Sequence, residues 1–288
     1  MSDRRYPVQG AGLGLRRDLL DALRDEIPGE IDFMEVAPEN WLKVGGYLGK
    51  QFRDIAERVP VALHGLSLSI GSPSPLDEEL VRNIKRFMNE HHCPVYTEHL
   101  SYCSDDGHLY DLMPIPFTEE AVRYVAGRIC RVQDILERRI AMENVSYYAA
   151  PGQEMKEIDF IRAVIEEANC DLHLDVNNIY VNSINHGYNA EDFLRALPGE
   201  RIVYCHVAGH YTEADDLLVD THGADVIDPV WKLLEVAYET FGVFPTLLER
   251  DFNIPPLEEL LREVRHIHSL QNKWRHQLEQ QPVAQAHG

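Results

Sequence analysis

Short apolar segments and amphipathic segments alternate along almost the whole chain, and this alternation limits the possible folds more than any other feature. Residues 61–69 and 201–210 are examples of the apolar kind, which is typical of buried strands. Residues 16–27 and 119–137 place apolar side chains at helical spacing. Strands that alternate with helices form a parallel sheet, and eight such units within 288 residues favour a closed barrel. We therefore predict an α/β fold, a (β/α)8 TIM barrel.

An open, doubly wound sheet is the competing fold, and it usually carries a glycine-rich phosphate loop. Residues 10–15, GAGLGL, match that glycine pattern only in part. No Gly/Ser linker and no change of composition marks a second domain. We predict a single domain over residues 1–271, followed by a polar, flexible tail over residues 272–288.

The formal net charge of −21 limits the partners that the chain can bind. Nucleic acids and anionic membranes both bind positively charged surfaces, so we expect neither as a partner. No apolar run approaches the roughly 18 residues that cross a bilayer, and the first ten residues lack the apolar core of a signal peptide. The five cysteines are scattered and odd in number. These features favour a cytoplasmic protein with free thiols.

Side chains that can bind metals follow nearly every predicted strand. Taken singly, each has a structural explanation, such as a hydrogen-bonded core histidine or a solvated carboxylate. Taken together, they place many charges around one barrel mouth, and burying uncompensated ions costs on the order of several kcal/mol each. A metal cation offsets that cost directly. The residues concerned are Glu35, Glu39, Asn40, His64, Glu98, His99, Glu143, Asn144, His173, Asp175, Asn177, Asn178, His206, His210, Asp220, His222, Glu249, Arg250 and Asp251.

The chemistry of this set indicates which metals it suits. It holds imidazoles and carboxylates but no cysteine, which disfavours a structural zinc site and favours iron, manganese or a hydrolytic zinc cluster. The ligand count exceeds the needs of one ion, so we predict two or three ions. In an extended segment Asp220 and His222 point the same way, as two ligands of one ion must. Histidines outside the set, such as His91, His92 and the loop residue His108, are predicted to be structural.

A family resemblance is carried by a series of ordered motifs. They are LHGLSLSIG (63–71), TEHLSY (97–102), MENVSYY (142–148), LDVNNIYVNSINHGY (174–188), CHVAGH (205–210), VDTHG (219–223) and PTLLERDFNIP (245–255). Together they resemble the multinuclear non-haem iron-dependent oxidases, whose members include the oxidase of methanobactin biosynthesis. The resemblance covers residues from about Gly10 to about Leu270 and implies a TIM barrel of the xylose-isomerase-like kind.

The resemblance also implies a cluster of two or three iron ions, in mixed Fe(II) and Fe(III) states, at the C-terminal mouth of the barrel. Carried over by motif, the implied metal ligands are His64, His99, Glu143, Asp175, Asn178, His206, Asp220, His222 and Glu249. The same order of ligands resembles the trinuclear zinc endonucleases of this fold, in which a histidine stands at the place of Asn178. We therefore expect the third metal position to bind more weakly than the other two.

Residues beside the implied ligands are expected to act on the substrate or to orient the cluster. The implied catalytic residues are His210, Asn177 and Arg250, and Arg250 could instead bind a peptide carboxylate. The side chains expected to orient the ligands are Glu35, Glu39, Asn40, Asn144, Asn177, Arg250 and Asp251. Aromatic residues near the mouth either line a peptide groove or simply pack, and these are Tyr102, Tyr147, Tyr148, Tyr180 and Tyr211.

The activity that the resemblance implies is the modification of a ribosomally synthesised precursor peptide at cysteine, with O2 as co-substrate and iron as cofactor. The iron ions bind the substrate thiolate and O2 in that chemistry. A small partner protein that binds the leader of the peptide is also implied. Two other functions are compatible with the residues: a zinc- or manganese-dependent hydrolase or isomerase on the same barrel, and a non-catalytic metal-binding protein.

Overall fold

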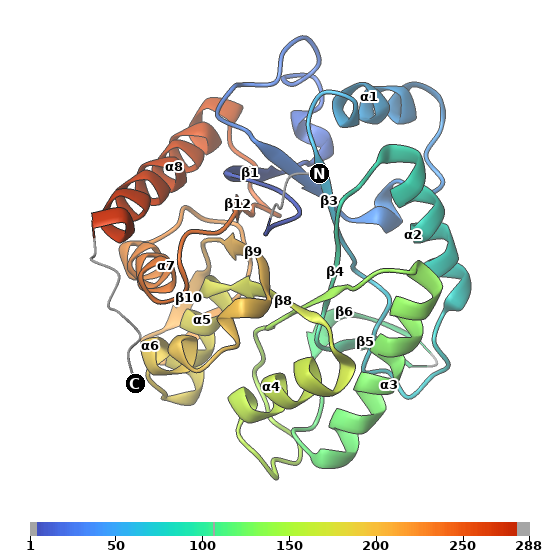
Figure 1. Ribbon diagram of the computed structural model, residues 1–288, viewed down its shortest axis with the longest axis vertical. Helices are drawn as coiled ribbons and strands as arrows, with labels where there is room; N and C mark the ends of the chain where they lie inside the picture. The colour runs from blue at the N-terminus through green and yellow to red at the C-terminus, as the bar shows by residue number, and fades with distance from the viewer. Residues whose placement is uncertain (1–4, 106, 281–288) are drawn as a thin grey trace.

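A closed barrel of eight parallel strands forms the centre of the computed structural model, which describes residues 5–105 and 107–280 (Figure 1). The strands pair in the order β1-β12-β9-β8-β7-β4-β3-β2, and β2 closes the ring on β1. Their bounds are β1 Ala11–Gly14, β2 Phe33–Val36, β3 Val61–His64, β4 Tyr96–His99, β7 Ala141–Glu143, β8 Asp171–Asp175, β9 Ile202–Val207 and β12 Thr246–Leu248. The predicted TIM barrel is confirmed.

Helices surround the barrel and connect its strands (Figure 1). They are α1 Gly46–Ala56, α2 Glu78–His91, α3 Glu119–Leu136, α4 Glu157–Ala168, α5 Val176–His186, α6 Ala190–Arg195, α7 Asp228–Phe241 and α8 Leu257–Gln280. The prediction of a helix over residues 16–27 is wrong, because this crossover holds only a 3-10 helix, Arg17–Leu19. Its apolar side chains Leu19, Leu20 and Leu23 are nonetheless buried, so a series of turns is enough to anchor them.

Two antiparallel hairpins follow barrel strands and were not predicted. The first joins β5 Tyr102–Ser104 to β6 His108–Met113, and the second joins β10 Tyr211–Ala214 to β11 Leu217–Val219. All four residues of β10 are exposed, so no alternation of apolar and polar residues reveals this strand in the sequence. His108, predicted in a loop, begins β6.

The last helix extends beyond the boundary that the sequence suggested. Residues 272–280, predicted as the start of a flexible tail, belong to α8. Trp274 packs against the hydrophobic core, and Lys273 forms an ion pair of 2.6 Å with Glu235 on α7, so this turn of helix is anchored. The rest of the predicted tail, residues 281–288, lies outside the described residues. We propose one domain that reaches at least to Gln280.

Side chains alternate between the inside and the outside of the barrel. On β9, Cys205 belongs to the core between the strands and the helices, whereas Tyr204 belongs to a separate cluster that fills the lower barrel. The members of that inner apolar cluster are Val8, Phe33, Ala62, Val95, Tyr204 and Leu247. The next inward position on several strands is polar, so the apolar floor supports a polar layer at the C-terminal mouth. Within the described residues, no helix has the length and apolar character needed to cross a bilayer.

Candidate metal centre

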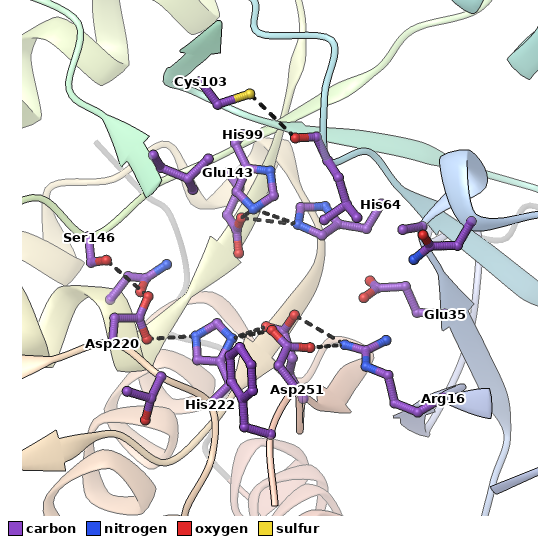
Figure 2. A pocket seen from close by; sticks show the side chains of 18 of the residues that line it. Arg16, Glu35, His64, His99, Cys103, Glu143, Ser146, Asp220, His222 and Asp251 are labelled. Atoms are coloured by element: carbon purple, nitrogen blue, oxygen red, sulfur yellow. Dashed lines mark hydrogen bonds and ion pairs between the residues drawn. The ribbon is translucent and has the colours of Figure 1, made fainter. Parts of the chain in front are cut away.

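The polar layer consists of the last inward-facing residue of six strands and of Glu249, which directly follows β12. Because parallel strands end at the same mouth of a barrel, these side chains converge on one point. They are Glu35, His64, His99, Glu143, Asp175, His206 and Glu249. A cavity of about 840 Å³ lies above them and is open at one side. Figure 2 shows Glu35, His64, His99 and Glu143 around this cavity, with Asp220 and His222 facing them from a loop.

Two groups of candidate ligand atoms lie on the strands and share Glu143. In the first, Nε2 of His64 and Nε2 of His99 are 3.1 Å apart, and each lies 3.3 Å from Oε2 of Glu143. In the second, Nδ1 of His206 lies 3.2 Å from Oε1 of Glu143, 3.9 Å from Oδ2 of Asp175 and 2.8 Å from Oε2 of Glu249. Atoms of four residues thus meet within 4.8 Å of one another in the second group.

A third group lies on the loop that follows β11. Nε2 of His222 is 2.7 Å from Oδ1 of Asp220, and Nδ1 of His222 is 3.2 Å from Oε2 of Glu249. The predicted shared direction of Asp220 and His222 is therefore seen, although His222 has a φ of 48° and the segment is not extended there. Asn178, which also lines the cavity, comes from the first turn of α5. Its strand neighbour Asp175 caps that helix through a bond of 2.6 Å to the Asn178 backbone N–H.

Several buried ligand atoms have no hydrogen-bond partner within the described part of the chain, which is the arrangement that a metal site requires. They are Oδ2 of Asp175, Oδ1 of Asn178, Nδ1 of His206, Nε2 of His222 and Oε2 of Glu249. Two of these atoms, Nδ1 of His206 and Nε2 of His222, lie only 2.8 Å from Glu249 and 2.7 Å from Asp220, but these contacts lack the geometry of a hydrogen bond. Buried polar atoms without partners are costly, and a cation placed between them removes that cost. The donor set therefore fits bound metal ions.

The pKa values of these groups show how strongly the site favours positive charge. Burial alone disfavours ionised carboxylates, but the imidazoles of His64 and His99 outweigh it and hold the pKa of Glu143 well below its usual value. Burial likewise disfavours a charged His206, yet the carboxylates of Glu249 and Glu35 raise the pKa of His206 well above its usual value. For Asp175, burial and the nearby charge of Glu143 raise the pKa. In the metal-free site protonated imidazoles supply the positive charge, and bound metal ions would supply it in their place.

The sequence matches the family described as RiPP precursor modification enzyme MbnB/TglH/ChrH over residues 10–272, where RiPP denotes a ribosomally synthesised and post-translationally modified peptide. The chain belongs to this family. A UPF0276 protein of Nitrosospira multiformis is 64% identical over 261 residues, which cover 90% of this chain and 92% of that protein. Membership confirms the resemblance seen in the motifs and supports an enzyme that acts on precursor peptides.

Solved structures show the same barrel at low sequence identity. An L-ribulose 3-epimerase superposes with a TM-score of 0.63 at 14% identity and covers 98% of this chain and 99% of its own. A xylose isomerase domain protein from Alicyclobacillus acidocaldarius superposes with a TM-score of 0.53 at 16% identity and covers 91% of this chain and 100% of its own. At these identities the likeness concerns the fold, which is the xylose-isomerase-like barrel that was predicted.

In this member of the RiPP modification family, His210 and Asn177 do not line the cavity; they form a hydrogen-bond chain that ends on Asp220. Nδ1 of His210 lies 2.7 Å from Oδ1 of Asn177, which fixes the amide so that its Nδ2 donates to Oδ1 of Asp220 at 2.9 Å. Ser146 donates to the other oxygen of Asp220 at 2.9 Å, and the Tyr148 hydroxyl accepts from the Asp220 backbone N–H. The predicted catalytic pair therefore lies where it positions a candidate ligand.

Arg250 is placed away from the cavity. Its guanidinium contacts Asp225 at 2.6 Å and Glu263 on α8 at 3.4 Å, and the residue is 5% exposed. The predicted catalytic role and the predicted contact with a peptide carboxylate do not agree with this position, because Arg250 lies on the side of the chain opposite to Glu249 and contacts Asp225 and Glu263. Arg16 lines the cavity in its place and was missed.

Arg16 lies between two acidic residues of the centre. Its guanidinium pairs with Asp251 (Figure 2). It also lies 3.7 Å from Glu249 and donates from Nε to the Arg250 carbonyl at 3.2 Å. Asp251 in turn contacts Nδ1 of His222 at 3.2 Å, so the predicted orienting contact of Asp251 is present. Arg16 follows the end of β1, and the strand-end pattern that selected the other residues also includes this position.

The remaining predicted orienting residues hold backbone segments around the mouth. Asn144 exchanges hydrogen bonds of 2.8 and 2.9 Å with the backbone of Asp175. Oε1 of Glu39 accepts from two backbone N–H groups of the loop after β3, and Asn40 lines the cavity. Of the predicted groove aromatics, Tyr148 lines the cavity, Tyr147 is buried and Tyr211 is exposed on β10, while Tyr102 and Tyr180 are half-buried.

Proposed function

We propose that the protein is a multinuclear non-haem iron-dependent oxidase that uses O2 to modify a ribosomally synthesised precursor peptide at cysteine. The observation that carries this proposal is the convergence of three groups of candidate ligand atoms beneath one open cavity, with unpartnered buried atoms in the second and third groups. Family membership supports the peptide substrate. The absence of cysteine from the ligand groups favours iron over a structural zinc site.

The proposed ligands divide into two strand-held positions and one loop-held position. His64, His99 and Glu143 hold the first ion, and Glu143, Asp175, His206 and Glu249 hold the second. Asn178, Asp220 and His222 hold the third. Bound iron supplies a Lewis acid for the substrate thiolate and a site that activates O2.

The chain itself provides the cavity that admits the peptide and limits water. Its volume of about 840 Å³ accommodates a short stretch of extended peptide. Apolar side chains at its edge, such as Leu66, Leu109 and Phe252, are exposed and can cover the peptide backbone. Arg16 partly offsets the acidic charge of Glu249 and Asp251 at the same edge, so a peptide does not meet a wholly negative surface.

The proposal includes two further points about the cellular context. A small partner protein that binds the leader peptide is proposed on the basis of the family resemblance. A cytoplasmic location is proposed because Cys93, Cys103, Cys130, Cys170 and Cys205 are all free thiols.

Metal analysis and oxygen uptake test the proposal together. The protein is purified without oxygen from iron-replete cells, and metals are counted by mass spectrometry. We expect two to three iron ions per chain, and O2 uptake when a cysteine-containing precursor peptide is added but not when its cysteines are replaced by serine. Stoichiometric zinc or manganese with little iron, and no O2 uptake, would instead indicate the hydrolase or isomerase. Bound iron without any turnover would indicate a non-catalytic metal-binding protein.

A further inference from the structure

A continuous hydrogen-bond chain crosses the barrel directly beneath the metal centre. It begins at Nδ1 of His64, which lies 2.8 Å from Oγ1 of Thr97. Thr97 Oγ1 lies 3.1 Å from the hydroxyl of Tyr204, and that hydroxyl donates to Oε2 of Glu35 at 2.5 Å. The same Oε2 lies 2.8 Å from Nε2 of His206. The outer nitrogens of two candidate ligands, on opposite sides of the barrel, are thus joined through three residues.

The chemistry of the groups fixes the direction of every bond in this chain. A carboxylate only accepts, so Glu35 receives hydrogens both from Tyr204 and from Nε2 of His206. Because the single hydroxyl hydrogen of Tyr204 points at Glu35, its oxygen is left to accept from Thr97. Because the one hydroxyl hydrogen of Thr97 is thereby directed at Tyr204, Oγ1 of Thr97 accepts from Nδ1 of His64. His64 therefore carries its hydrogen on Nδ1.

These directions determine which ring nitrogen of each histidine faces the metal. His64 protonated on Nδ1 presents the lone pair of Nε2 to the group with His99 and Glu143. His206 protonated on Nε2 presents the lone pair of Nδ1 to Glu143, Asp175 and Glu249. A neutral imidazole offers only one lone pair, so the opposite tautomer of either ring would turn an N–H toward the ion.

We propose that Glu35, Tyr204 and Thr97 form a positioning relay that sets the tautomers of His64 and His206 and joins the two strand-held metal positions into one unit. None of the three is among the proposed metal ligands. Tyr204 is the central member, because its hydroxyl is the link between Glu35 and Thr97. Its ring is fully buried and held by His173 at 4.1 Å and Phe33 at 5.9 Å between ring centroids, so the hydroxyl is rigidly placed. The inference rests on the metal centre of the proposed function but not on its O2 chemistry.

The structure offers matched controls for removal of these hydroxyl groups. Tyr238 on α7 is also fully buried, and its hydroxyl lies 2.5 Å from Oγ1 of Thr246, itself fully buried. Neither Tyr238 nor Thr246 lines the cavity. The variants Tyr238→Phe and Thr246→Val therefore lose a buried hydroxyl pair of the same kind without touching the relay. They show how much metal release results from lower stability of the fold alone, without any change in the relay.

The test compares the rate at which the metal-loaded protein releases its ions to excess EDTA. Loss of a partner that orients a metal ligand typically weakens binding about 10- to 100-fold, so we expect Tyr204→Phe and Thr97→Val to release metal at least about 10-fold faster than wild type. Thr97→Ser, which keeps Oγ1, is expected to restore slow release. Tyr238→Phe and Thr246→Val are expected to stay within about twofold of wild type, even where their melting temperatures fall.

Two results would overturn the relay. One is release at the wild-type rate from both Tyr204→Phe and Thr97→Val. The other is equally fast release from the two control variants, which would assign the effect to general destabilisation. A wild-type chain that takes up no metal at all would contradict the proposed function. Because wild type is measured first, this outcome is distinguished from a failure of the relay alone.

Discussion

The proposed metal positions on barrel strands differ from the proposed position on the loop after β11. Most of the strand residues are almost fully enclosed, with the side chains of His206 and Glu143 exposed by 0% and 2%, whereas those of Asp220 and His222 are exposed by 12% and 13%. Among the strand residues His99 is the exception, with a side chain exposed by 15%. The strand ligands are fixed by a continuous ladder of backbone hydrogen bonds. The loop ligands depend on side-chain contacts and on a left-handed residue, His222.

This difference in rigidity predicts a difference in metal affinity between the strand-held and loop-held positions. Ligands on strands lose little entropy when an ion binds, because their positions are already set by the barrel. Ligands on the loop must be held by neighbours, and an amide oxygen from Asn178 adds no charge to that position. We therefore expect tight binding at the two strand-held positions and weaker, partial occupancy at the third.

The largest expected effect is the loss of a strand ligand. In His206→Ala the second position loses a ligand from the rigid part of the site, and the neighbouring carboxylates of Glu143 and Glu249 lose the positive partner they share. We expect metal affinity there to fall by at least about 100-fold, more than for loss of an orienting partner, and activity to be abolished. Metal content by mass spectrometry checks this.

The control for that variant is His268→Ala on α8, whose imidazole contacts the Glu30 carbonyl at 2.8 Å far from the cavity. It is expected to keep all metal. Full metal content in His206→Ala would contradict the assignment of His206 as a ligand.

A smaller effect is expected from the loop. Asp220→Ala removes a ligand of the third position only, so we expect the partly occupied third ion to be lost while the two strand-held ions remain. Activity is expected to be abolished as well. Loss of every ion from Asp220→Ala would show that the strand-held and loop-held positions are not separable, and the comparison drawn above would be wrong.

A still smaller effect is expected when the support of the loop is removed and its ligands are kept. In Asn177→Ala, Asp220 loses the amide that donates to Oδ1, and His210 loses its partner. We expect the affinity of the third position to fall about 10-fold, with no change at the other two. Titration of the metal-depleted protein with Fe(II) under anaerobic conditions measures this, with the exposed Asn272→Ala on α8 as control. An affinity equal to that of wild type would limit Asn177 to a packing role.

The smallest effect concerns the stability of the segment that carries Ser146 and Tyr148. The Tyr147 hydroxyl donates to Glu157 at 3.0 Å, and the Asn182 amide donates to the other oxygen of Glu157 at 3.4 Å. These two hydrogen bonds help to hold the segment in place. Burial raises the pKa of Glu157 to about 8, and the hydrogen bonds from Tyr147 and Asn182 oppose that shift only in part. The neutral form is therefore favoured in the fold, and its contribution to stability is lost as the pH rises through about 8.

Glu157→Gln keeps the shape of the neutral acid and cannot ionise. We expect it to raise the free energy of unfolding by about 1–2 kcal/mol at pH 9, with little change at pH 5, because only the wild type carries a buried charge at the higher pH. Denaturant unfolding at the two pH values measures this. Glu166→Gln, exposed on the same helix, is expected to be without effect at either pH. A gain that is the same at both pH values would exclude ionisation as its cause.

The strand-held part of the centre could be predicted from the sequence because the geometry of barrel strands is regular. Side chains alternate, parallel strands end together, and a polar residue at the inward end of each strand must therefore lie at the mouth. His64, Glu143 and His206 follow this rule directly. Sequence spacing also placed Asp220 beside His222, although not the left-handed backbone that brings them together.

Other features could not be predicted because they depend on contacts between distant parts of the chain. The link from Glu35 to Tyr204 joins residues 169 positions apart, and nothing local in the sequence shows it. Arg250 looks like a mouth residue by spacing, yet its register turns it toward Glu263 on α8. The exposed β10 hairpin and the last turns of α8 lack the apolar periodicity on which their prediction would depend.

The most direct measurement of the central claim is anomalous X-ray scattering at the iron edge, from crystals of protein purified without oxygen. We predict two strong peaks beside Glu143, one toward His64 and His99 and one toward His206, and a weaker third peak between Asp220 and His222. Iron peaks away from these residues, or none at all in crystals of protein that contains iron in solution, would contradict it.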